Sequence, residues 1–140
     1  MNINLYGHNG QWLMVDCGVT FNVPLEREQD EAVGARRYNM VTADVSFIAN
    51  RRESLCGIVL THAHEDHLGA VLSQWPELQC PIYTTAFTAE VLKRKAYRAE
   101  ITYELPIVIV EPLSVLDIGP FTVEWIPTTH SIPDANALLI

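Results

Sequence analysis

The sequence predicts a mixed α/β domain in which helices pack outside layered β-sheets. Three observations lead to this prediction. Strand-like segments come first as a hairpin, and later strand-like segments alternate with helical ones. The 140 residues are enough for one domain with a real hydrophobic core. The hydrophobic fraction of 49% and the charged fraction of 19% are those of a globular chain and not of a disordered one.

The first elements are a hairpin, a loop and a short helix. Residues 3–6 and 11–16 read as two strands joined by the turn GHNG. The polar segment EREQDEAVGARRYN (26–39) has the composition of a surface loop. Residues 43–54, ADVSFIANRRES, are expected to contain a short helix.

The middle of the chain alternates strands and helices. GIVLT (57–61) is a continuous apolar and β-branched run, typical of a strand covered on both faces. Apolar residues then recur at helical spacing over 68–75, and Pro76 is expected to close that helix. PIYTT (81–85) predicts another strand, and Thr88 is expected to cap the helix that follows.

The last third of the chain is strand-like. PIVIVEP (106–112) and FTVEWIPTTH (121–130) predict two strands, with Gly119–Pro120 as the turn between them. The final ALLI (137–140) predicts a strand that is cut off in the middle, where the given sequence stops.

Composition excludes some classes of function. The net charge of −8 argues against broad electrostatic attraction to nucleic acid, although basic residues gather locally in KRKAYR (93–98), so charge neither identifies nor excludes RNA as a partner. No apolar stretch approaches the ~20 residues of a membrane helix, and the first residues do not form a signal peptide. The three cysteines are odd in number and lack CxxC spacing, so we expect them to remain reduced in the cytoplasm.

A dense histidine cluster follows the strand predicted at 57–61. THAHEDHLGA (61–70) places three histidines and two carboxylates within six positions. Neutral imidazole is a preferred zinc ligand, and carboxylate oxygen is an acceptable one. His62 and His64 are two residues apart, so their rings can point to the same side of an extended segment. With Asp66 and His67, they predict a metal site built largely from one loop.

The cluster and its surroundings resemble the HxHxDH signature of the metallo-β-lactamase superfamily. That motif marks only the superfamily, whereas THSIPD (129–134), taken with LYG and WPEL, is more specific. Three longer stretches narrow the resemblance to the ribonuclease J family, within the group that carries a β-CASP insertion: residues 2–21, residues 57–71 with 75–92, and residues 118–140.

The resemblance implies a metallo-β-lactamase-like αββα sandwich, of which only the N-terminal part is expected in this chain. It also implies two zinc ions, or manganese ions, per active site of the full-length protein. His62, His64 and His130 would hold the first metal, and Asp66 and His67 would bind the second. All five residues are therefore expected to be catalytic, with Asp66 also orienting the attacking water.

Two further residues receive supporting roles from the resemblance. Asp16 would orient the metal loop through hydrogen bonds without binding metal. Ser131 would meet a substrate phosphate, or would bond only to its own turn. Asp134 stands where the family more often has glutamate.

The activity implied is that of a zinc-dependent ribonuclease, a hydrolase with 5′-to-3′ exonuclease and endonuclease action in RNA processing, including rRNA processing, and in RNA decay. RNA is the expected partner, with no membrane, and the full-length form is expected to be a homodimer or homotetramer in the cytoplasm. We expect residues 1–140 to be a partial domain that lacks its first strand, its second half, and the β-CASP and C-terminal domains. The family's bridging aspartate would then lie outside the chain, so we expect this piece alone to be inactive.

Two alternatives stay open at this point. The chain could come from another hydrolase of the superfamily, such as a thioesterase, lactonase or lactamase, because ligand spacing alone does not identify the substrate. It could also be a non-catalytic metal-binding subunit. The WPEL and THSIPD segments favour the ribonuclease, and the presence of all the early ligands argues against a decayed relative.

Overall fold

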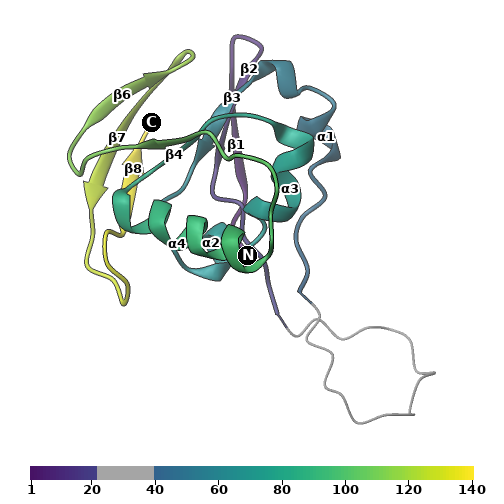
Figure 1. The fold of residues 1–140 in the computed structure, drawn as a ribbon. Coiled ribbons are helices and arrows are strands. Elements are labelled where there is room, and N and C mark those ends of the chain that lie inside the picture. The colour runs from purple at the N-terminus through teal and green to yellow at the C-terminus, as the bar shows by residue number, and fades with distance from the viewer. Residues whose placement is uncertain (22–39) are drawn as a thin grey trace.

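The computed structural model describes residues 1–21 and 40–140, and these residues form two β-sheets and a layer of helices (Figure 1). The predicted surface loop at 26–39 lies outside the described residues. The larger sheet has five strands in sequence order: β1 (Asn4–His8), β2 (Gln11–Val15), β3 (Leu55–Val59), β4 (Ile82–Thr84) and β5 (Ile107–Ile109). The smaller sheet contains β6 (Val115–Ile118), β7 (Phe121–Pro127) and β8 (Asn136–Leu139).

The helices are short except for the last. They are α1 (Ser46–Ala49), the 3₁₀ helix η1 (Arg52–Ser54), α2 (Glu65–Leu68), α3 (Val71–Leu78) and α4 (Ala86–Arg98). In the described ranges, none of them is long and apolar enough to cross a membrane.

The five-stranded sheet combines a hairpin with parallel strands. β1 and β2 pair antiparallel through a tight turn, in which Asn9 and Gly10 have φ angles of 49° and 77°. Positive φ at both central residues is the geometry that matches the twist of a two-residue hairpin. β2, β3, β4 and β5 then pair in parallel. The predicted hairpin is therefore confirmed.

Side chains of the five-stranded sheet alternate between two hydrophobic cores. Along β2, Leu13 and Val15 belong to a core shared with the smaller sheet, whereas Met14 packs in a core shared with the helices. Ile58 and Val59 of β3 divide in the same way. Successive side chains of a strand point to opposite faces, so an apolar run on such a strand requires cover on both sides.

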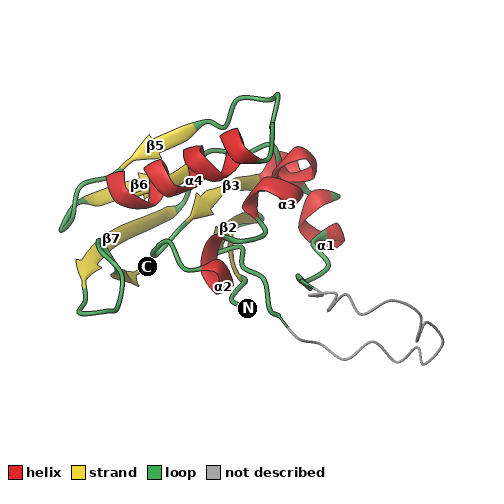
Figure 2. Cartoon of the chain, turned by 60° about the horizontal axis from the view of Figure 1, so that its bottom comes forward, coloured by secondary structure: helices red, strands yellow, loops and turns green. Residues whose placement is uncertain are grey.

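The smaller sheet closes one face and the helices close the other. Trp125 of β7 is fully buried between the sheets, and Leu92 of α4 is fully buried on the helix side. Figures 1 and 2 show β6 and β7 on the far side of the larger sheet from α1 and α3. The layers therefore run helices, sheet, sheet, and the predicted layered α/β architecture is confirmed.

The helix predicted at 68–75 differs from the structure at both ends. A first helical turn, α2, already begins at Glu65. The helix is interrupted at Gly69–Ala70 and resumes as α3. The prediction that Pro76 ends the helix is wrong, because Pro76 lies inside α3. Proline has no N–H to donate to the carbonyl of Leu72. The hydroxyl of Tyr103 donates to that carbonyl instead, and the Tyr103 ring stacks on Trp75 with centroids 5.2 Å apart.

Two other local predictions are corrected. Thr88 does not cap α4: the cap position belongs to Thr85, and neither hydroxyl has a hydrogen-bond partner among the described residues. The turn at Gly119–Pro120 joins β7 to β6 and not to the strand at 107–109, because residues 115–118 form a strand of their own. The final segment is a strand, as predicted, and it pairs with β7.

Candidate metal centre

The predicted site residues gather where β2 and β3 end. These strands are parallel, so their carboxyl ends lie at the same edge of the sheet. Asp16 directly follows β2, and the segment from Thr61 to His64 leads from β3 into α2. Open α/β sheets bind ligands beyond the carboxyl ends of their strands for this geometric reason.

Three imidazoles converge on one point at this edge. His62 Nε2 and His130 Nε2 each lie 3.1 Å from the same atom, His64 Nδ1. One ligand atom from each ring falls within 4.8 Å of the others. The three rings meet nearly edge to face, with centroid separations of 4.8 Å for every pair.

This donor set fits a divalent metal such as zinc. Zinc–nitrogen bonds of about 2.0–2.1 Å in a tetrahedral site separate ligand nitrogens by roughly 3.3 Å. The observed 3.1 Å separations are close to that value. Three protein ligands is also the number typical of catalytic zinc sites. His62, His64 and His130 are therefore a candidate metal site.

Asp16 connects the two ends of the histidine segment, at Thr61 and at His67, through its carboxylate. Its carboxylate is buried and accepts hydrogen bonds from the Thr61 N–H at 2.9 Å and from the Thr61 hydroxyl at 3.0 Å. It also lies 2.8 Å from His67 Nδ1. The φ of Asp16 is 61°, a left-handed conformation that aspartate tolerates better than most residues. Asp16 therefore contacts both Thr61 and His67, and its predicted orienting role stays a prediction.

This network defines which ring nitrogens can bind a cation. A carboxylate only accepts hydrogen bonds, so Asp16 favours the neutral tautomer of His67 that carries its proton on Nδ1 and has its lone pair on Nε2. The Thr61 hydroxyl donates to Asp16, and it can therefore accept from His62 Nδ1, which lies 2.9 Å away. His62 Nε2 is then the free acceptor, and it is the atom that points to His64 and His130.

The electrostatics favour neutral His62 and a cation near His67. Burial, and then the charge of the neighbouring His67, lower the pKa of His62 to about 4, so this ring is neutral at physiological pH. Burial would also lower the pKa of His67, but the hydrogen bond and charge of Asp16, together with Asp66, outweigh it and raise that pKa. The same negative potential favours a bound cation at His67 Nε2.

Asp66 and His67 pair with each other beside the three-histidine group. Asp66 Oδ2 lies 3.5 Å from His67 Nε2. The side-chain nitrogen of Asn2 contacts both atoms, at 3.1 Å from the carboxylate and 3.0 Å from the ring nitrogen. The structure thus places these two residues together but outside the convergent group formed by the three histidines.

Close backbone contacts hold α2 against the segment after β2. Cys17 N donates to His67 O at 2.7 Å, and Ala70 N donates to Cys17 O at 2.9 Å. A Cβ atom on Gly18 would lie 1.8 Å from the Asp66 carbonyl oxygen, so only glycine permits this approach. These contacts hold α2, and with it the histidine-bearing segment that leads into it, against residues 17–18.

His130 reaches the site from the other sheet, on the segment between β7 and β8. Thr128, Thr129 and His130 line a surface hollow together with Asp16 and His62. Ser131 is exposed next to His130, but it does not line this hollow, and its side chain has no hydrogen bond to any described residue. Its predicted contact with a substrate phosphate stays a prediction.

The sequence analysis did not identify two residues that contribute to the site. Thr61 reads as the last β-branched residue of a strand, yet its hydroxyl connects Asp16 to His62. Asn2 precedes the first strand and has no motif of its own, yet it contacts Asp66 and His67. In both cases the role arises from contacts between distant segments.

Comparison with known proteins agrees with this geometry. The sequence model described as the metallo-beta-lactamase superfamily matches residues 2–136. The chain is 42% identical over 144 residues to a ribonuclease J from Sinorhizobium meliloti, covering 100% of this chain and 24% of that protein. It is 33% identical over 129 residues to a ribonuclease J from Helicobacter pylori, covering 91% of this chain and 17% of the relative. The predicted resemblance to the ribonuclease J family is confirmed, and the chain spans a quarter or less of these relatives' length.

Solved structures share the fold at low sequence identity. The metallo-beta-lactamase fold protein YhfI from Bacillus subtilis aligns with a TM-score of 0.62 and 21% identity over 98% of this chain and 48% of that one. Rubredoxin oxygen:oxidoreductase from Desulfovibrio gigas aligns with a TM-score of 0.64 and 18% identity over 98% of this chain and 29% of that one. The second protein is named as an oxidoreductase, so the shared fold alone does not determine the reaction.

Proposed function

The chain belongs to the metallo-beta-lactamase superfamily, and from that premise we propose that it carries the metal-binding loops of a metal-dependent ribonuclease. The proposed reaction is the hydrolysis of RNA phosphodiesters, by 5′-to-3′ exonuclease and endonuclease action, in RNA processing and decay. Support for RNA as the substrate comes from the similarity to proteins named ribonuclease J along nearly all of this chain.

The observation that carries the proposal is the convergence of three imidazole nitrogens from two sheets. A histidine with a purely structural role satisfies its ring nitrogens with separate protein partners. Here two rings, from His62 and His130, point at the same nitrogen of His64, which lies 66 positions from His130 in sequence. That arrangement supports a shared cation as the partner of all three.

We propose two metal positions. His62, His64 and His130 would hold one divalent ion, and Asp66 and His67 would contribute to a second, with zinc or manganese as candidates. When bound, such ions supply Lewis acidity that activates water and offsets the negative charge developing on phosphorus. Two divalent ions would also offset about half of the net charge of −8, which favours the approach of a polyanion.

The chain's own side chains would prepare the site for that chemistry. Asp16 and Thr61 would keep His62 and His67 in the tautomers that leave their Nε2 atoms free to hold the ions. The Asp66 carboxylate is half exposed, and it would be available to accept a proton from the attacking water. Three free cysteines fit a reducing compartment, which supports the proposed cytoplasmic location.

Metal content and substrate choice test the proposal together. The full-length gene product, stripped with a chelator and reloaded with zinc or manganese, is expected to cleave a fluorescent single-stranded RNA only when reloaded. A panel of thioester and lactone substrates serves as the comparison. Hydrolysis of a thioester or lactone without RNA cleavage would favour another hydrolase of the superfamily, and metal binding without any hydrolysis would favour a non-catalytic subunit.

Residues 1–140 alone give a second test. Because the first metal has three donors here and the second has only two, zinc titration of this chain is expected to show one tight site. Efficient RNA cleavage by this chain, or two tight sites, would contradict the expectation that the piece alone is inactive.

A further inference from the structure

The candidate metal site depends on how the segment bearing His130 docks on the rest of the protein. His62 and His64 lie on the loop after β3, in the five-stranded sheet, whereas His130 lies between β7 and β8 of the smaller sheet. Residues 128–135 are called the His130 loop below. The imidazoles converge only if this loop is held in a fixed position against the larger sheet.

The base of the His130 loop is fixed by backbone hydrogen bonds. Thr128 N donates to Ala135 O at 2.9 Å, which closes the neck of the loop. Asn136 N donates to Thr61 O at 3.1 Å, which joins the neck to the metal-binding segment, the residues after β3 that include His62 and His64. Ile132 packs against the core on the helix side. These contacts leave the polar part of the loop tip to be fixed by another group.

The N-terminus of α4 lies at this loop and lacks a cap of its own. Thr85 occupies the cap position but makes no side-chain capping hydrogen bond. The hydroxyls of Thr85 and Thr88 are buried and have no partner among the described residues. The first N–H groups of a helix need acceptors, and the cap residue usually accepts from the second or third helical residue.

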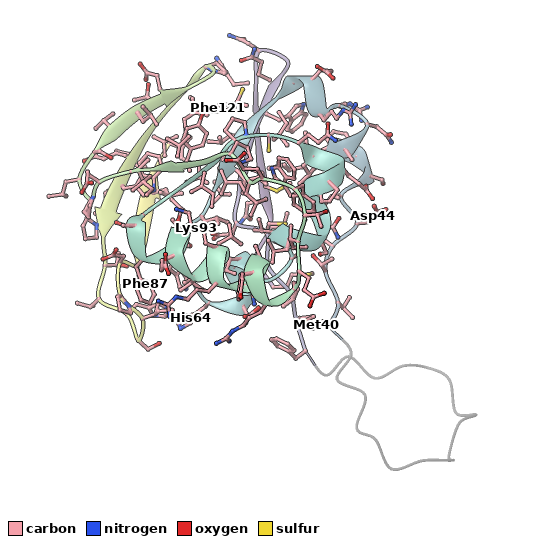
Figure 3. All side chains as sticks on the ribbon, viewed as in Figure 1. Met40, Asp44, His64, Phe87, Lys93 and Phe121 are labelled. Carbon is pink, nitrogen blue, oxygen red and sulfur yellow. The ribbon has the colours of Figure 1, made fainter. Side chains whose placement is uncertain are left out.

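Asp134 of the His130 loop supplies an acceptor at that position. Its Oδ2 lies 3.4 Å from the N–H of Phe87, the second residue of α4. A carboxylate there also interacts favourably with the positive end of this 13-residue helix. Figure 3 shows Phe87, in the first turn of α4, and His64 at the same edge of the molecule.

The backbone of Asp134 is held as well as its side chain. Its φ is 54°, a left-handed conformation that aspartate tolerates. Its carbonyl accepts a hydrogen bond of 2.7 Å from the side-chain amide of Asn136, the residue that also bonds to Thr61. The loop tip is therefore connected to α4 on one side and to the metal-binding segment on the other.

We propose that Asp134 is a positioning residue for the metal site: it caps α4 from the His130 loop and thereby holds His130 within reach of His62 and His64. This inference rests on the proposed metal site. It assigns Asp134 a role through His130, without contact to the metal, and it explains why α4 has no cap from its own sequence.

The test compares Asp134→Ala, Asp134→Asn and Asp134→Glu with Asp117→Ala. Asp117 is an exposed aspartate on β6 whose carboxylate accepts a hydrogen bond from the Thr122 hydroxyl. Zinc affinity is measured by competition with a chromophoric chelator, and the ligand set by the visible spectrum of bound cobalt. We expect Asp134→Ala to bind zinc about tenfold more weakly, as other residues supporting metal ligands do. Its cobalt spectrum is expected to weaken, because water molecules that replace the His130 ligand would raise the coordination number of cobalt, and cobalt of higher coordination number absorbs more weakly.

The conservative variants separate positioning from general stability. Asp134→Glu, which keeps a carboxylate, is expected to restore both affinity and spectrum, and Asp134→Asn, which keeps only the acceptor, is expected to fall between. Asp117→Ala should match the wild type. Wild-type affinity and spectrum in Asp134→Ala would overturn the inference while leaving the metal site intact. Failure of the wild type itself to bind zinc would instead overturn the proposed function and this inference with it. If Asp134→Ala does not fold, equal affinities of the wild type and Asp134→Asn would overturn the inference.

Discussion

Replacing Asp16 by asparagine should reverse the proton position on His67. The Asp16 carboxylate accepts from Thr61 N–H, from the Thr61 hydroxyl and from His67 Nδ1, at 2.9, 3.0 and 2.8 Å. Asparagine has nearly the same shape and also tolerates the φ of 61° found here. Its amide, however, offers one acceptor and one donor group.

The N–H and the hydroxyl of Thr61, both hydrogen-bond donors, determine the orientation of the asparagine side-chain amide. The amide oxygen must face Thr61, because the NH₂ group would otherwise meet a backbone N–H that cannot accept. The NH₂ group then faces His67 Nδ1, which must become an acceptor, so the proton moves to Nε2. The lone pair predicted to bind the second metal is lost, and the pKa of His67 falls because the hydrogen bond and charge of Asp16 no longer raise it.

The expected effect is large at one metal and small at the other. Loss of a residue that supports a metal ligand typically weakens binding about 10- to 100-fold, or roughly 1.4–2.7 kcal/mol. We expect that loss for the metal bound by His67 in the full-length gene product. The Thr61 hydroxyl still bridges to His62, so the three-histidine site should change by less than about threefold.

Two measurements check this prediction. Long-range ¹H–¹⁵N NMR spectra of the imidazoles report the tautomer of His67 without metal, and metal titration reports the affinity of each site. Asp117→Asn, on the surface of β6, is the matched control. The reasoning is refuted if His67 in Asp16→Asn still carries its proton on Nδ1, or if the second metal binds as tightly as in the wild type.

Three further substitutions test other parts of the structure. His64→Ala should abolish the proposed RNA cleavage by the full-length gene product and lower zinc affinity, with an unchanged thermal unfolding midpoint when both proteins are measured free of metal; near-normal turnover would remove the metal mechanism. Trp125→Ala should lower the free energy of unfolding by about 3–5 kcal/mol, whereas Ile126→Ala, which is 39% exposed, should cost less than about 1 kcal/mol in urea titrations, and equal losses would contradict the assigned core. Tyr103→Phe should cost about 1 kcal/mol because the α3 carbonyl opposite the proline loses its donor. Tyr97→Phe, 86% exposed, should have no effect, and an unchanged stability in Tyr103→Phe would contradict the role given to that hydroxyl.

The parts of the structure that sequence analysis predicted are those defined by local pattern. The apolar run before the histidines predicted a strand with cover on both faces, and Ile58 and Val59 do belong to different cores. The short spacing from His62 to His67 predicted a strand-to-helix turn that carries several donors, because that geometry depends only on neighbouring residues.

The missed features depend on residues distant in sequence. Proline is permitted inside α3 because Tyr103, 31 positions from Leu72, satisfies the carbonyl there. A helix cap was expected from Thr88, but the acceptor comes from Asp134, 47 positions from Phe87. Neither contact leaves a periodic signal. His130 was likewise identified through the resemblance of THSIPD to a known family, since a lone histidine after a strand has no distinguishing pattern.

The three imidazole nitrogens of the candidate site come from segments of two different sheets. The stability of the contact between these sheets would therefore depend on the concentration of the metal ion. An ion that binds only the folded chain stabilises it by about 2.7 kcal/mol when its free concentration is a hundred times the dissociation constant. Most of that gain would act across the seam between the sheets. Without the ion that stabilisation would be lost, and the two sheets that bury Trp125 between them would be held together by their packing and the hydrogen bonds of the His130 loop.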